Sequence, residues 1–179
     1  HLIGPLQTNK TKDALALFDV IHTVDRPKLV RSIAKEAQTV GRCPKLLVQV
    51  NTGEEDQKAG VLPSEVEALV QLMRDENLPL AGLMCIPPVE DAPAGHFAFL
   101  KRLADDLGLP FASMGMSGDY QTAVELGATH VRVGSAIFGV RPPLSHCKTA
   151  LSSSRQFDKF HKGSTWACDR MTEDRVRLT

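Results

Sequence analysis

The chain has 179 residues, of which 42% are hydrophobic and 23% charged, a composition that suits one globular domain with a sizeable core. Its 21 basic residues balance its 21 acidic ones, so net charge gives no reason to expect nucleic acid or an anionic membrane as a partner. No apolar run approaches the roughly 18 residues that a membrane-spanning helix needs. None of the four cysteines forms a Cys-x-x-Cys pair, which favours a reducing, cytoplasmic location.

Short β-branched runs alternate with stretches of helical periodicity over residues 1 to 140. The first run opens at Ile3 and leads into an amphipathic stretch over 13–18. Pro27 opens a helix that Gly41 ends, after a strand at 20–24. The later predicted elements are strands at 46–50, 80–86, 111–114 and 130–133, and helices at 64–72, 97–107 and 122–126. Most strands are continuous apolar runs, a pattern typical of strands covered on both faces.

Repeated strand-then-helix units predict a parallel sheet with right-handed crossovers. Six strands can be counted in this region. An open doubly wound sheet holds six, whereas a (β/α)₈ barrel needs two more, so periodicity leaves both architectures open. The periodic pattern ends near Leu144. We therefore expect one domain over residues 1–143 and a poorly ordered C-terminal tail over 144–179.

Two neighbouring strand-to-helix junctions carry the residues most suited to binding a ligand. Segment 113–119 contains Ser117, and segment 131–136 contains Gly134 and Ser135. Glycine lets the backbone approach a ligand closely, and exposed N–H groups at the start of a helix favour an anion. The loops after the last strands of a parallel barrel commonly form a phosphate site. The sequence thus predicts a phosphate between Ser117 and the pair Gly134 and Ser135; the alternative is two ordinary tight turns with capping serines.

Arg132 lies two residues before Gly134, and alternation along a strand puts both on one face. An arginine that points into a barrel mouth is costly unless it is paired, so it is either part of a structural ion pair or a fixed cation beside the ligand. His1 and Lys10 are interpreted as structural or solvated residues. The acidic loop over 51–60 lacks the ligand spacing of a calcium site, and no metal is expected there.

Five segments, taken in order, resemble the signatures of the pyridoxal phosphate homeostasis protein family. They are HLIGPLQTNK at 1–10, QVNTGEEDQKAG at 49–60, GLM at 82–84, SMGMS at 113–117 and VRVGSAIFG at 131–139. The resemblance implies a (β/α)₈ TIM-type barrel similar to the N-terminal domain of alanine racemase. Strands three to eight of that barrel are the ones expected in this chain, which is therefore identified as an N-terminally truncated member.

The resemblance also implies pyridoxal 5′-phosphate as cofactor, held as a Schiff base, and a role in storing, buffering or delivering it without an established catalytic turnover. By analogy, Ser117, Gly134 and Ser135 hold the phosphate, Arg132 faces the pyridine nitrogen and Met116 lies near the ring. An arginine at that nitrogen disfavours its protonation and weakens the ring as an electron sink, which suits a carrier. The family's Schiff-base lysine belongs to a strand ahead of those seen here, so binding by this chain alone is expected to be weak and led by the phosphate.

Two enzyme classes stand as alternatives. An amino-acid racemase or lyase of the alanine racemase type uses a tyrosine from a second β-domain, whereas the only tyrosine here is Tyr120, at the start of a helix. A phosphosugar-type barrel enzyme needs an acid or base at the strand ends, where Asp25 and Asn51 lie without a converging pair of carboxylates. Candidate partners are the cofactor and apoenzymes that need it. A complete member is expected to be monomeric, and an open barrel is expected to associate with itself.

Overall fold

A computed structural model describes residues 1–139, and the tail predicted over 144–179 lies outside the described residues. The strands are β1 (Val20–Val24), β2 (Lys45–Val50), β3 (Leu80–Cys85), β4 (Phe111–Met116) and β5 (His130–Arg132). The α-helices are α1 (Thr11–Leu17), α2 (Pro27–Val40), α3 (Val66–Asp75), α4 (Pro93–Asp106), α5 (Tyr120–Glu125) and α6 (Ser135–Phe138). Two short 3₁₀ helices, η1 (Thr8–Lys10) and η2 (Pro63–Glu65), precede α1 and α3.

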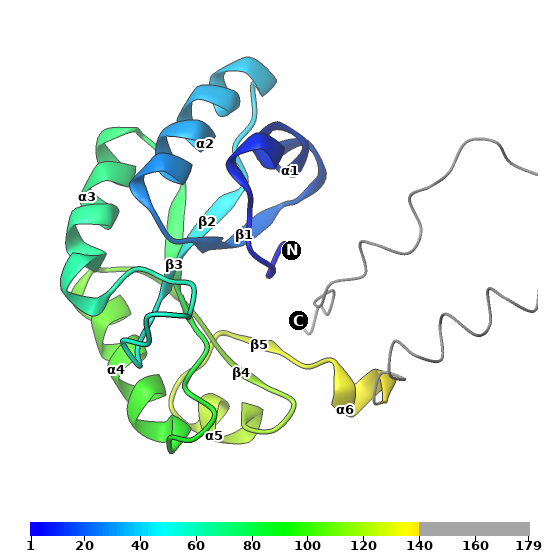
Figure 1. The fold of residues 1–179 in the computed structure, drawn as a ribbon, viewed down its shortest axis with the longest axis vertical. Helices are drawn as coiled ribbons and strands as arrows, with labels where there is room; N and C mark the ends of the chain where they lie inside the picture. The colour runs from blue at the N-terminus through cyan, green and yellow to red at the C-terminus, as the bar shows by residue number, and fades with distance from the viewer. Residues whose placement is uncertain (140–179) are drawn as a thin grey trace, which may run out of the picture.

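The five strands form one parallel sheet in the order β1-β2-β3-β4-β5, and a helix connects each strand to the next. Helices α2, α3 and α4 lie along one side of this sheet (Figure 1). A doubly wound sheet reverses its strand order at a switch point, whereas a (β/α)₈ barrel adds each strand beside the last. The sequential order therefore identifies the sheet as an arc of such a barrel, as the family resemblance implied.

The first of the six predicted strands is reduced to one isolated parallel bridge, between Leu2 and Ile21. The Leu2 N–H donates to the Val20 carbonyl, and the His22 N–H donates to the Leu2 carbonyl. The chain cannot continue this ladder far, because Pro5 has no N–H to donate. The segment still occupies the expected place next to β1, so the order of the barrel is kept.

Helix α2 shows how local sequence sets the elements. Pro27 stands in its first turn, where the missing N–H has no intrahelical partner to lose. Gly41 ends the helix in the left-handed conformation, with φ of 71°, which glycine adopts without a steric penalty. Leu29, Val30 and Ile33 form its buried face. The prediction of this helix and of its end is confirmed.

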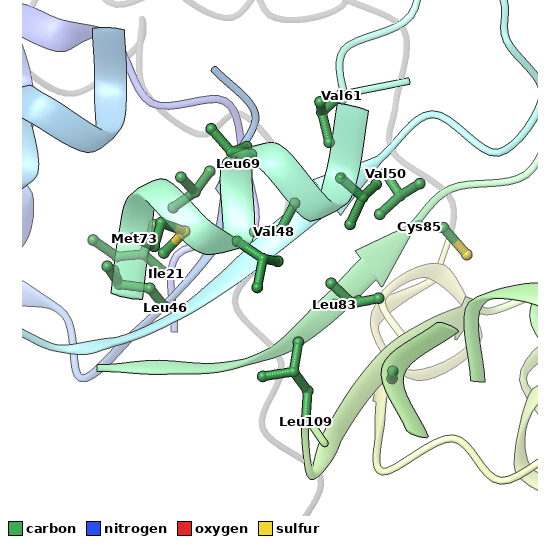
Figure 2. Close-up of a cluster of buried hydrophobic side chains, with 14 of the residues drawn as sticks. Ile21, Leu46, Val48, Val50, Val61, Leu69, Met73, Leu83, Cys85 and Leu109 are labelled. Carbon is green, nitrogen blue, oxygen red and sulfur yellow. The ribbon is translucent and has the colours of Figure 1, made fainter. Parts of the chain in front are cut away.

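The two faces of the sheet differ in chemistry. The face that meets the helices is apolar: Figure 2 shows Leu69 and Met73 of α3 in one buried cluster with Val48 of β2 and Leu83 of β3. The opposite face, which we call the inner face, holds a smaller apolar cluster of Val20, Leu47 and Met84, none of them helical. Besides Thr23, whose hydroxyl donates to the Gly4 carbonyl, four buried polar side chains come from strands: His22, Gln49, Ser113 and Arg132. This polar layer leads toward the carboxyl ends of the strands.

Candidate functional site

The two predicted junctions meet at the carboxyl ends of β4 and β5. Met116 and Arg132 are partners in the register of these two strands. Ser117 follows Met116 directly, and Gly134 precedes α6. All five residues proposed from the sequence therefore belong to one corner of the sheet, and strand pairing brings the two junctions side by side.

The hydroxyl of Ser117 connects the junctions. Its Oγ atom accepts hydrogen bonds from the backbone N–H groups of Gly134, at 3.2 Å, and Ala136, at 3.3 Å. Two amides from the second junction thus point at a single oxygen atom from the first. A Cβ at Gly134 would meet no atom within 4 Å, so the backbone there faces open space. Ser135 is exposed and begins α6.

The amide of Ala136 escaped the sequence-based prediction. Every residue except proline carries the same backbone donor, so residue type gives no signal for it. Only its place in the first turn of the last helix, where N–H groups lack intrahelical partners, was available as an indication.

A tight turn holds Ser117 in place. The Met116 N–H donates to Oδ1 of Asp119 at 2.6 Å, and the Asp119 N–H donates to the Met116 carbonyl at 3.1 Å. Gly115, just before this turn, has φ of 90°, and a Cβ on it would lie 2.5 Å from the Cβ of Ala123 in α5. The glycine of this junction therefore serves the turn and the packing of α5, whereas the sequence had suggested that it lets a ligand approach.

Arg132 is 7% exposed, and two of its hydrogen-bond acceptors are Ser113 and the Cys85 carbonyl. Its Nη1 donates to the hydroxyl of Ser113 at 2.8 Å, and its Nη2 donates to the Cys85 carbonyl at 2.7 Å. Burying a guanidinium is costly unless hydrogen bonds and opposite charge compensate for the lost water. These two hydrogen bonds hold the guanidinium next to the converging amides, where a positive charge suits an anionic ligand.

Below the arginine lies a histidine that was not among the predicted site residues. His22 of β1 is 1% exposed, and its Nδ1 lies 2.9 Å from the Ser113 hydroxyl. Its Nε2 lies 3.1 Å from Nδ1 of His1, so His1 has a structural contact. Burial, followed by the charge of Arg132, lowers the pKa of His22 from 6.5 to about 3. His22 is therefore neutral near pH 7.

Comparison with known proteins shows the family of this chain. The alanine racemase N-terminal domain family matches residues 1–142. The chain belongs to this family. Within the family it groups with the pyridoxal phosphate homeostasis proteins: that of Vibrio cholerae is 45% identical over 151 residues, which are 79% of this chain and 64% of the relative. That of Synechocystis is 36% identical over 151 residues and 69% of its own length. The chain thus spans about two thirds of these relatives.

Solved structures agree with this assignment. PipY from Synechococcus elongatus PCC7942 without PLP has a TM-score of 0.72 and 38% identity, over 78% of this chain and 70% of PipY. PipY with PLP bound has a TM-score of 0.66 and 36% identity, over 78% and 69%. Alanine racemase of Clostridium difficile, at 17% identity and a TM-score of 0.62, covers 78% of this chain and 39% of its own length and shares the fold.

The residues named for enzyme chemistry lie away from the β4 and β5 corner. Asp25 forms an ion pair with its neighbour Arg26. The Asn51 side chain donates to the Glu55 carbonyl at 2.8 Å and accepts the Glu55 N–H at 3.3 Å, which shapes its own loop. Lys10 is exposed in η1.

Residues 1–139 contain no group of three His, Cys, Asp or Glu side chains that could hold a metal ion. Over the same residues, no helix has both the length and the apolar character to cross a bilayer.

Proposed function

We propose that this chain binds pyridoxal 5′-phosphate at the β4 and β5 corner and serves its homeostasis by storing, buffering or delivering it. The observation that carries the proposal is the convergence of the Gly134 and Ala136 amides on one oxygen atom beside the buried Arg132. Backbone donors at the start of a helix, together with a hydroxyl, are a common way to hold a phosphate. Family membership and the PipY structure with PLP bound support the same ligand.

The proposed roles follow the chemistry of each group. Ser117, Gly134 and Ser135 hold the phosphate through a hydroxyl and backbone amides, with Ala136 as a further donor. Arg132 faces the pyridine nitrogen, where its fixed positive charge disfavours a proton on that nitrogen. Met116, whose side chain is 40% exposed at the end of β4, lies along the ring. The cofactor, when bound, supplies a reactive aldehyde and an electron-withdrawing ring, and an unprotonated ring withdraws electrons less strongly.

This arrangement favours a carrier over an enzyme. A broad transaminase gains from a ring that draws electrons strongly, and a cation fixed at the ring nitrogen opposes this. The curated relatives at 36% and 45% identity carry the name of homeostasis proteins, whereas the alanine racemase of Clostridium difficile resembles this chain in fold alone. We further propose that the protein acts in the cytoplasm and passes the cofactor to apoenzymes. An assay for amino-acid racemisation by the cofactor-loaded protein separates the two classes, and turnover would favour the enzyme.

The binding proposal is tested by calorimetric titration of the 179-residue chain with pyridoxal phosphate and with inorganic phosphate. We expect phosphate to compete with pyridoxal phosphate, because binding is led by the anionic group. Ser117→Ala removes one hydrogen bond to a charged ligand, worth about 1.5 kcal/mol, and should weaken both ligands roughly tenfold.

Ser32→Ala is the matched control. Ser32 lies in α2, and its hydroxyl donates to the Thr8 carbonyl of η1 and to Thr11 of α1, neither of which belongs to the β4 and β5 corner. It should leave both affinities unchanged. Pyridoxal phosphate that binds equally well to Ser117→Ala, or that phosphate fails to displace, would contradict the proposed site.

A further inference from the structure

A line of hydrogen bonds crosses the inner face of the sheet from β5 to the N-terminal segment. Nη1 of Arg132 lies 2.8 Å from Oγ of Ser113, and that Oγ lies 2.9 Å from Nδ1 of His22. Nε2 of His22 lies 3.1 Å from Nδ1 of His1. Ser113 is fully buried and His22 nearly so, which excludes bulk water from the middle of the line. Each link must therefore be satisfied by its protein neighbours.

The direction of this line follows from the donors available. A guanidinium can only donate, so the Ser113 oxygen accepts from Arg132. The hydroxyl hydrogen of Ser113 then has Nδ1 of His22 as its acceptor. A neutral imidazole has one donor and one acceptor, so His22 carries its proton on Nε2 and donates it to His1. A proton on Nδ1 would aim a second N–H at the Ser113 oxygen and leave the buried hydroxyl hydrogen without this acceptor.

We propose that Ser113 and His22 are positioning residues that fix the guanidinium of Arg132 for the cofactor ring. This inference rests on the proposed function and adds two residues to that site. The Cys85 carbonyl at the end of β3 accepts a hydrogen bond from Nη2, and the Ser113 hydroxyl in β4 accepts one from Nη1. Two neighbouring strands thus set the plane of the guanidinium. His22 acts one step further back, by holding the Ser113 hydroxyl turned away from Arg132.

Ligand-free nuclear magnetic resonance reads this positioning directly. In the unsubstituted chain we expect separate signals for the guanidinium Nη–H protons of Arg132, because both amino groups are held. Nitrogen chemical shifts of His22 should show a proton on Nε2 and none on Nδ1. A His22 ring protonated on Nδ1 would overturn the proposal without any substitution.

Substitutions then test each link. Ser113→Ala and His22→Phe should merge the separate Arg132 Nη–H signals into an averaged signal. His22→Asn should keep the signals separate, because an asparagine amide oxygen can accept a hydrogen bond where Nδ1 does. Ser113→Ala and His22→Phe should also weaken pyridoxal phosphate about tenfold, the effect of one misplaced charged hydrogen bond. Inorganic phosphate should bind as before, since Ser117 and Gly134 are outside the line. Ser32→Ala should change none of these readouts.

The outcomes separate the two proposals. Separate Arg132 signals that persist in Ser113→Ala and in His22→Phe overturn the positioning role, whatever the ligand does. Equal losses of phosphate and pyridoxal phosphate affinity also overturn it, because a general loosening of the site would then explain the effect. If the Arg132 signals change as expected but neither the unsubstituted chain nor any variant binds pyridoxal phosphate, the positioning of Arg132 stands and the proposed cofactor is wrong.

Discussion

The imidazole of His22 makes the free energy of unfolding depend on pH. Arg132 and His130 of β5 and His1 of the N-terminal segment surround it. Burial first, and the positive charge of Arg132 second, lower its pKa from 6.5 to about 3. The unfolded chain takes up this proton below pH 6.5, whereas the folded chain stays unprotonated until about pH 3. The free energy of unfolding must therefore decrease as pH falls through this window.

We expect a decrease of about 1.4 kcal/mol or less for each pH unit from His22, measured by urea unfolding at several pH values. His22→Asn cannot take up the proton and should show a shallower dependence over the same window. His130, whose pKa is also lowered by burial and by Lys45, acts in the same direction, so His130→Asn is the control for its share. Identical slopes for the unsubstituted chain and His22→Asn would contradict this account.

Part of the site was predictable from residue type and part was not. Ser117 and Gly134 stand out in the sequence because a hydroxyl and a glycine occur at two successive strand-to-helix junctions, although each alone is also typical of an ordinary tight turn. Ser113 and His22 carry no such local signal: 91 positions separate them, and only the pairing of strands brings them together. A histidine inside a mostly β-branched strand was the visible clue, since a buried polar side chain requires a partner.

At the scale of elements, the junction of β4 and α5 depends on one glycine. Gly115 has φ of 90°, and an added Cβ would lie 2.5 Å from the Cβ of Ala123 and 3.1 Å from the Cα of Tyr120. Gly115→Ala should lower the free energy of unfolding by about 2–4 kcal/mol, through backbone strain and overpacking. Urea unfolding measures the change.

Gly118→Ala is the matched control, because a Cβ at Gly118 would meet no atom within 4 Å and its φ is not in the left-handed range. It should change the free energy of unfolding by less than about 1 kcal/mol. A similar effect of both substitutions would show that the close packing of α5 on β4 is not what requires Gly115.

The elements themselves were largely readable from the chain. Strong periodicity and terminal signals, such as Pro27 and Gly41, located α2 well. The starts of α3 and α4 differ from the predicted ones. The 3₁₀ helix η2 precedes α3, and α4 already begins at Pro93, before its first buried apolar residue. The run at Ile3 was overestimated as a strand, since its apolar residues indicate burial and do not show how many backbone hydrogen bonds a neighbour will accept.

For the whole molecule, strand order was the feature that periodicity could not supply. Six alternating units are compatible with an open sheet or with part of a barrel, and only the family signatures favoured the barrel. The sequential order of the sheet confirms that choice. It also leaves β5 with a strand neighbour only on its β4 side within residues 1–139. The N–H and C=O groups on such an edge are a template for pairing with another chain.

We therefore expect the 179-residue chain to self-associate as its concentration rises, because pairing with a second chain satisfies the edge groups of β5. Sedimentation velocity over a wide range of concentrations measures this. Phe138→Ser removes an exposed ring of α6, 75% accessible, and leaves the β5 backbone intact. Association through the strand edge should survive that substitution, whereas association through exposed apolar side chains should weaken. A single monomeric species at every concentration would show that the edge of β5 is satisfied by other means.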